Sequence, residues 1–207
     1  METNVAKIYL LKMRSICEKF GVPLILAKGV LIGAIRDNAL LPGDKDIDLF
    51  TLYTAPYEKI VQAVKEFIEN GFKYLEIYKI PSGKIIHWSF DTKANLHFCF
   101  KILSPSIDPN FLCETGIVNG RQTEPTITLL PTHLFVLPKE IIFLGHKFLV
   151  PNPPEDYLTN NYGNWRVPYS QNQNWRKSRT WQIYPVSKCP KSPWKSISRV
   201  DMHKSEN

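Results

Sequence analysis

Three aspartates at alternate positions are the most informative feature of this chain: Asp44, Asp46 and Asp48 run into an apolar Leu-Phe segment. Side chains at positions i, i+2 and i+4 of a strand share one face, so an extended backbone would gather these carboxylates. Like charges that close repel one another unless a cation lies between them. A hard divalent ion with oxygen ligands, Mg²⁺ or Mn²⁺, suits such a site.

Two glycines and an arginine precede the aspartates: Gly29, Gly33 and Arg36. Glycine lets backbone amides approach a phosphate closely, and arginine binds phosphate oxygens through its planar fork. Metal-binding carboxylates next to a phosphate-binding segment indicate phosphoryl or nucleotidyl transfer.

Alternating aspartates also occur in solvated loops and in calcium sites. An EF-hand loop requires glycine at its sixth position and glutamate at its twelfth. Counted from Asp44, these positions hold Leu49 and Pro56, which excludes an EF-hand. The glycine and arginine residues in front of the aspartates favour phosphate chemistry over a solvated loop.

Length and composition indicate one well-packed domain with a short additional segment, because the chain has 207 residues and 43% apolar content. We expect no transmembrane segment, since no apolar run reaches the roughly 18 residues that a spanning helix needs. The first residues lack the pattern of a secretory signal. Four scattered cysteines form no C-x-x-C pair, which argues against a zinc site. We therefore expect a cytoplasmic protein.

The net charge of +7 lies in the last part of the chain. Residues 164–207 contain nine basic and two acidic residues, whereas the first 163 residues contain 17 of each. The sequence thus predicts a neutral body followed by a basic segment.

Hydrophobic periodicity gives the expected elements. Spacing of three and four predicts amphipathic helices, and the glycines that follow two of them suit helix ends. Spacing of two predicts strands between the turns. The expected helices are 4–20, 29–36, 55–70 and 151–160, and the expected strands are 23–27, 46–52, 72–80, 85–90, 96–103, 126–130, 140–144 and 147–150.

Beyond Gly163 no apolar period remains, and there are no internal repeats. The order of elements predicts an α+β fold built on a mixed β-sheet with flanking helices.

The segment G-V-L-I-G-A-I-R-D-N-A-L-L-P-G-D-K-D-I-D-L resembles the signature G-T-L-L-G-A-x-R-x-x-x-x-I-P-W-D-x-D-x-D of the LicD/fukutin family, which has the nucleotidyltransferase fold. A second resemblance follows in F-L-G, V-P, Y-L and Y-G-N-W, between Phe143 and Trp165. Together they cover about Lys7 to Pro168. We therefore expect a LicD-like domain over residues 1–168 and a basic, aromatic-containing C-terminal extension over residues 169–207.

The resemblance implies a Mg²⁺- or Mn²⁺-dependent enzyme that transfers a phospho-alcohol, such as phosphocholine or ribitol phosphate, from a CDP-linked donor to a glycan hydroxyl. Asp46 and Asp48 would hold the metal at the donor pyrophosphate, and Asp44 would assist. The residues implied in binding the donor are Lys28, Gly29, Val30, Gly33, Arg36, Tyr162, Trp165 and Arg166. Such catalysis agrees with the physics of phosphoryl transfer, because charge spreads over the phosphate oxygens in the transition state and an aspartate can accept the hydroxyl proton.

The chain departs from the family pattern at three points. Val30 replaces a residue with a hydroxyl group, and Gly43 replaces a tryptophan. The fold also usually supplies a further carboxylate from a neighbouring strand. Asp91 is the candidate for a further metal ligand, although it also suits a turn, and His97 suits an interior hydrogen-bonded position as well as a site.

Several interpretations stay open. Tyr162 and Trp165 line the donor base or cap the fold. The densest aromatic and basic patch, 175–181, belongs to a loosely folded extension, to a surface for an anionic acceptor or a membrane, or to a site for single-stranded nucleic acid. The alternatives for function are nucleotidyl transfer from an NTP to a small molecule or RNA end, and a catalytically degenerate binding module.

Overall fold

The computed structural model of the chain describes residues 3–44, 46–116, 124–168 and 180–202. Its helical elements are α1 (Thr3–Phe20), α2 (Lys28–Ile32), the π-helical turn η1 (Gly33–Asp37), α3 (Tyr57–Glu69), α4 (His133–Val136), α5 (Pro154–Tyr162) and the 3₁₀ turn η3 (Val186–Lys188). Its strands are β1 (Ile25–Leu26), β2 (Asp46–Leu52), β3 (Phe72–Lys79), β4 (Ile85–Thr92), β5 (His97–Pro105), β6 (Phe111–Gly116), β7 (Thr126–Pro131), β8 (Lys139–Phe143), β9 (His146–Val150), β10 (Ile183–Pro185) and β11 (Ser198–Asp201).

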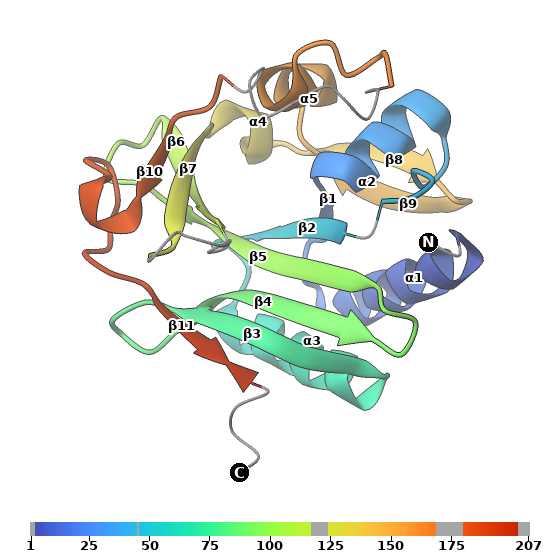
Figure 1. Ribbon diagram of the computed structural model, residues 1–207, viewed down its shortest axis with the longest axis horizontal. Coiled ribbons are helices and arrows are strands. Elements are labelled where there is room, and N and C mark those ends of the chain that lie inside the picture. Colours follow the sequence, from blue (N-terminus) through green and yellow to red (C-terminus); the bar gives the residue numbers. More distant parts are fainter. Residues whose placement is uncertain (1–2, 45, 117–123, 169–179, 203–207) are drawn as a thin grey trace.

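Strand β5 joins two parts of the sheet (Figure 1). Its first seven residues pair with β2 in parallel, and most of the same stretch pairs with β4 on its other side. Its last two residues pair instead with β6, which continues into β7 and β10. The acidic strand β2 therefore lies between β5 and the short β1, in the middle of a mixed sheet.

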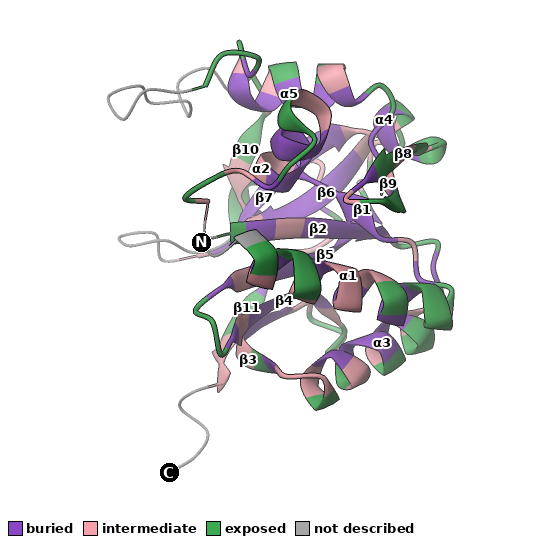
Figure 2. Cartoon of the chain, turned by 90° about the vertical axis from the view of Figure 1, so that its right-hand side faces the viewer, coloured by how far each residue is buried: buried purple, intermediate pink, exposed green. Residues whose placement is uncertain are grey.

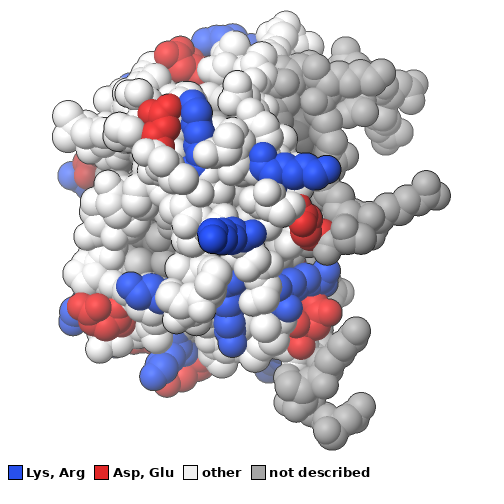
Figure 3. Space-filling model, turned by 90° about the vertical axis from the view of Figure 1, so that its left-hand side faces the viewer, with Lys and Arg blue, Asp and Glu red and all other residues white. Residues whose placement is uncertain are grey.

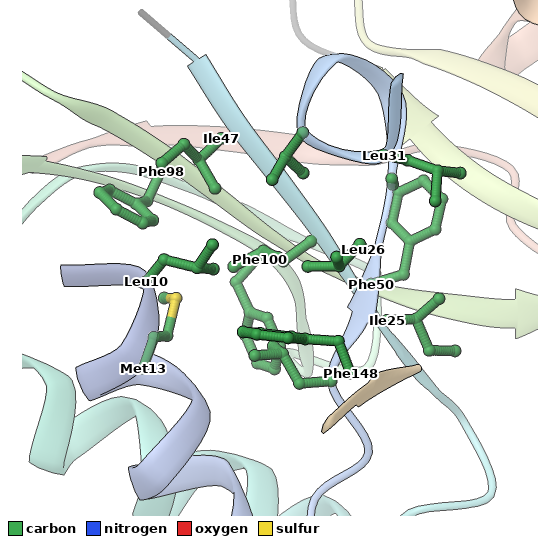
Figure 4. Packing of buried hydrophobic residues seen from close by; sticks show 14 of the residues in the cluster. Leu10, Met13, Ile25, Leu26, Leu31, Ile47, Phe50, Phe98, Phe100 and Phe148 are labelled. Atoms are coloured by element: carbon green, nitrogen blue, oxygen red, sulfur yellow. The ribbon is translucent and has the colours of Figure 1, made fainter. Parts of the chain in front are cut away.

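One face of this sheet is covered by α1 and α3, which turn their buried residues toward it (Figure 2). Leu10 and Met13 of α1 lie beside Phe98 and Phe100 of β5 (Figure 4). The ring of Phe67 on α3 meets Phe100 edge-on, with 5.7 Å between centroids. Burial of these large apolar side chains is the main contribution to the stability of this layer.

The opposite face of β2 is covered in part by α2, α4 and α5. Phe50 points to this side, where its ring lies 6.2 Å from that of Phe135 and 6.4 Å from that of Tyr157. Because side chains alternate along a strand, Asp48 and Asp46 share this face with Phe50. The face is thus apolar at one end of β2 and acidic at the other.

The expected α+β architecture with a mixed sheet and flanking helices is confirmed, and the long helices and the strands β2 to β5 lie within a few residues of their predicted bounds. The predicted strand 23–27 is shorter, and the predicted helix 29–36 starts at Lys28 and passes into a π-helical turn at Gly33. Strand β6 was not predicted.

The C-terminal extension contains regular structure that its sequence did not predict. Strand β10 pairs with β7, and β11 pairs with β3, so the described part of the extension borders both parts of the sheet. The predicted patch 175–181 falls mostly outside the described residues, and of its members Trp181 packs against Tyr157.

Basic residues of the extension are used within the fold. Arg199 pairs with Glu76 at 2.6 Å and with Asp201 at 2.8 Å, and Lys191 pairs with Asp108 at 2.9 Å. On the face that carries β10, the described lysine and arginine side chains are dispersed, several of them next to acidic ones (Figure 3). In the described part of the chain, no helix is long and apolar enough to cross a membrane.

Candidate active site

The polar face of the sheet brings together Asp46, His97 and Asp91 from three neighbouring strands. Asp46 is paired in register with His97, and His97 with Asp91. His97 Nδ1 lies 3.1 Å from Asp91 Oδ1, and its Nε2 lies 3.4 Å from Cys99 Sγ. The imidazole is therefore held on both sides, next to the exposed Asp46.

The surroundings of His97 favour its protonated form. Burial lowers its pKa, but the hydrogen bonds to Cys99 and Asp91 and the charge of Asp46 outweigh burial and raise the pKa to about 10. His97 is therefore an imidazolium at neutral pH, and its charge is opposed by the carboxylates on both sides.

Asp48 belongs to a ring of four charges. Lys28 Nζ lies 3.3 Å from Asp48 Oδ1 and 2.8 Å from Glu114 Oε1. Lys101 Nζ contacts the same two oxygens, at 3.3 and 3.0 Å. Lys101 and Glu114 have side chains only 1% and 4% exposed, whereas Lys28 reaches the surface with 19%.

The four groups fix one another's charge. Burial opposes ionisation of Asp48, Glu114 and Lys28, but the two ammonium groups hold the pKa of Asp48 and that of Glu114 below their ordinary values, and the two carboxylates raise the pKa of Lys28. A buried charge without such a partner costs several kcal/mol, on the order of 3–5 when one partner of a pair is removed. Lys28, Asp48 and Glu114 are therefore charged at neutral pH.

The backbone before β2 places Lys28 in this ring. Lys28 has a left-handed conformation with φ 51°, which is uncommon outside glycine and costs on the order of 1 kcal/mol. The N–H of Ala27 donates to the carbonyl of Asp48 at 3.1 Å, so the start of α2 is tied to the strand that carries the second aspartate.

Asp44 lies before the strand, which begins at Asp46. The prediction of three aspartates on one strand is therefore wrong for Asp44. Its Oδ1 accepts a hydrogen bond from the N–H of Asp46 at 3.3 Å, and its Oδ2 occupies the space where a Cβ of Gly29 would stand. Gly29 thus allows close approach of Asp44, at the place where the sequence predicted a phosphate.

Arg36 connects the two segments that the sequence matched to one family. It forms a two-pronged pair with Asp37, at 2.9 and 2.7 Å, and its Nη1 donates to the carbonyl of Trp165 at 3.1 Å. Residues 129 positions apart therefore meet. In this state the arginine binds the protein's own acceptors.

The remaining predicted donor-binding residues have packing roles in the structure. Val30 lies in the core, and a Cβ on Gly33 would overlap the carbonyl of Ala39. Tyr162 and Trp165 are buried, with the indole N–H of Trp165 donating to Thr159 at 3.2 Å. The exposed Arg166 stacks over the ring of Trp165, 4.4 Å from its centroid.

The arrangement does not fit a metal cage of three aspartates. Asp44 lies against Gly29, and Asp48 Oδ1 accepts two ammonium groups. Among the described residues, no group of three histidine, cysteine or acidic side chains is placed to hold a metal. The exposed Asp46 does fit a cation that takes its other ligands from substrate phosphates, which is a common mode of Mg²⁺ binding.

Sequence reasoning missed Lys101 and Glu114. Each is an isolated charge in a strand of otherwise apolar or small residues, F-C-F-K-I-L and F-L-C-E-T-G. A charged residue in such a strand needs a buried partner of opposite sign, and this is the signal that would have identified the pair.

Comparison with known proteins identifies the family. Residues 21–153 match the model described as LicD/FKTN/FKRP, nucleotidyltransferase domain. Among solved structures, the lincosamide antibiotic adenylyltransferase LnuA with bound lincomycin is similar, with 13% identity over 72% of this chain and 82% of that chain, at a TM-score of 0.45. No curated protein matches the sequence. The family model covers well over half of the chain, and the chain therefore belongs to the LicD/FKTN/FKRP nucleotidyltransferase family, whose kind of chemistry is phospho-alcohol transfer.

Proposed function

We propose that the chain transfers a phospho-alcohol, such as phosphocholine or ribitol phosphate, from a CDP-linked donor to a glycan hydroxyl with the help of Mg²⁺ or Mn²⁺. The observation that supports this most is the family match over residues 21–153, which includes the acidic strand β2. The exposed Asp46 at the start of that strand, which is paired in register with His97, is a carboxylate of the kind that the chemistry requires.

In this reaction the acceptor hydroxyl oxygen attacks the phosphorus that carries the alcohol. The bond from that phosphorus to the bridging oxygen breaks, CMP leaves, and the hydroxyl proton passes to a carboxylate. Asp46 would hold the divalent ion together with the donor phosphates, and the ion supplies positive charge for the phosphate oxygens. Arg166, exposed beside Trp165, would contact the donor from the side of α5.

The test is release of CMP from CDP-choline, CDP-ribitol and CDP-glycerol, with a glycan acceptor and Mg²⁺, combined with thermal stability in the presence of each donor. We expect at least one donor to raise the melting temperature and to be turned over. Asp46→Asn, which keeps the shape and removes the charge, should lower turnover about 100-fold or more. Glu140→Gln on the β8–β9 hairpin is the matched control and should retain activity, because Glu140 pairs with Lys147 at the surface. Failure of all three donors to bind or react would refute the proposal.

One observation favours the alternative of a degenerate binding module. On β5, the residues paired with Asp46 and Asp48 are His97 and Cys99, and neither supplies the further carboxylate that the fold usually takes from a neighbouring strand. Donor binding without turnover, unchanged in Asp46→Asn, would support that alternative. Pyrophosphate release from an NTP would instead support nucleotidyl transfer.

A further inference from the structure

The ring of Lys28, Asp48, Lys101 and Glu114 neutralises the second aspartate of the acidic motif from within the chain. Each ammonium nitrogen contacts one oxygen of Asp48 and one oxygen of Glu114, and all four distances lie between 2.8 and 3.3 Å. Two of the members, Lys101 and Glu114, are nearly inaccessible to solvent. The ring is therefore part of the folded structure and does not consist of mobile surface side chains.

Its position coincides with the place where a metal would contact Asp48. A divalent ion bound to Asp48 Oδ1 would lie about 2 Å from that oxygen. Both ammonium nitrogens lie 3.3 Å from the same oxygen, so the ion and the two lysines would repel one another at short range. On β5, the residues that share this face beside Asp48 are Cys99 and Lys101, neither of which adds a carboxylate.

Lys28 is the member of the ring that reaches the surface. Its side chain is 19% exposed, against 1% for Lys101. It precedes Gly29 at the start of α2, and its left-handed backbone turns the side chain toward Asp48 and Glu114. Of the two lysines in the ring, Lys28 is therefore the one that a donor phosphate can reach.

We propose that Lys28 and Lys101 take the place of a metal ion at Asp48, the second aspartate of the motif. Asp48 and Glu114 are positioning residues that hold the two ammonium groups, Lys28 contacts the donor phosphate, and Asp48 binds no divalent cation. This inference rests on the proposed function, because it names how that site recognises its donor.

The first test counts metal ions in the wild-type chain. Mn²⁺ is titrated in the presence of saturating CDP-choline, and bound Mn²⁺ is measured by electron paramagnetic resonance. At most one Mn²⁺ per chain supports the proposal. A second Mn²⁺ bound with comparable affinity overturns it.

The second test separates charge from packing at Lys28. Lys28→Met should weaken CDP-choline binding at least tenfold at saturating Mg²⁺, and Lys28→Arg, which keeps the charge, should recover most of the loss. Lys19→Met is the matched control, since Lys19 pairs with Glu66 at 2.6 Å on α1 and α3, and it should bind the donor as the wild type does. Unchanged donor binding in folded Lys28→Met overturns the proposal.

Inorganic pyrophosphate distinguishes failure of this inference from failure of the proposed function. If CDP-alcohols do not bind but pyrophosphate does, and Lys28→Met weakens pyrophosphate tenfold, the donor assignment fails and the role of the lysines stands. If CDP-alcohols bind equally to wild type and Lys28→Met, the donor assignment stands and the lysine inference fails. If neither probe binds the wild-type chain, both fail.

Discussion

The two faces of β5 differ in how they are stabilised. Phe98 and Phe100 point to the side of α1 and α3, where aromatic rings and aliphatic side chains surround them. Cys99 lies between these two phenylalanines in sequence, and Lys101 follows Phe100. Both point to the other side of the sheet, where contacts are made through hydrogen bonds and ion pairs. Alternate residues of one strand thus belong to two different environments.

The two faces differ in which substitutions they tolerate. An apolar contact is non-directional, and loss of one side chain leaves a cavity that neighbours partly fill. A charge in the ring around Asp48 has specific partners, and its removal leaves an uncompensated charge that repacking cannot correct. The face toward α1 and α3, which we call the helix-covered face, therefore maintains the fold. The face that carries Cys99 and Lys101, the polar face, maintains an arrangement of charges.

The largest effect is expected on the helix-covered face. Phe100→Ala removes a fully buried ring that contacts Phe67 and Trp88, and should lower the free energy of unfolding by about 3–5 kcal/mol. Urea unfolding measures this loss. A loss below about 1 kcal/mol would contradict the importance of this layer.

On the polar face, Lys101→Met should lower the free energy of unfolding by about 3 kcal/mol, because two buried carboxylates then share one ammonium group. The double variant Lys101→Met, Glu114→Gln leaves one Lys28–Asp48 pair and should recover part of the loss. Urea unfolding of the wild type, both single variants and the double variant forms the required cycle. Strict additivity of the two single effects would show that the ring is not coupled.

Local patterns predicted the helix-covered face well. The apolar period identified α1 and α3, and β2 to β5 were predicted from alternation alone. Such patterns work where a residue's environment follows from its neighbours in sequence.

The charge ring and the extension could not be predicted in this way. Lys101 and Glu114 meet because β5 changes partner from β2 to β6, which is a long-range property of the sheet. Strands β10 and β11 have little apolar pattern of their own, and they form because β7 and β3 offer edges to pair with. Asp44 does not share the extended backbone of Asp46 and Asp48, because the Pro42-Gly43 turn precedes it and its carboxylate accepts the N–H of Asp46.

A smaller effect on stability is expected from raising the pH. The pKa of His97 is raised to about 10 in the folded chain, against about 6.5 when unfolded. Its contribution to stability is therefore fully present below pH 6.5 and is lost as pH rises toward 10. We expect the melting temperature to fall by a few degrees between pH 6.5 and 9.5, and to fall less in His97→Asn. Parallel curves for both proteins would contradict this prediction.

The smallest effect concerns the contact between Arg36 and Trp165. Arg36→Met removes the hydrogen bond to the Trp165 carbonyl and the pair with Asp37, and should cost about 1 kcal/mol. Arg36→Lys keeps the charge but loses the two-pronged geometry, so it should recover less than half of that loss. Thermal unfolding of both variants measures the difference, and equal stability of Arg36→Lys and wild type would show that charge alone is sufficient.

Strands β10 and β11 have a consequence for how copies of the chain behave toward one another. Each occupies the outer side of a strand, β7 or β3, whose backbone N–H and C=O groups would otherwise be open to another molecule. A chain that ended before Ile183 would present two uncovered borders, and it would also lose the buried residues Val186, Cys189 and Ile197 from the smaller hydrophobic cluster that contains Ile127. Such a shortened chain should aggregate at concentrations at which the full chain remains monodisperse.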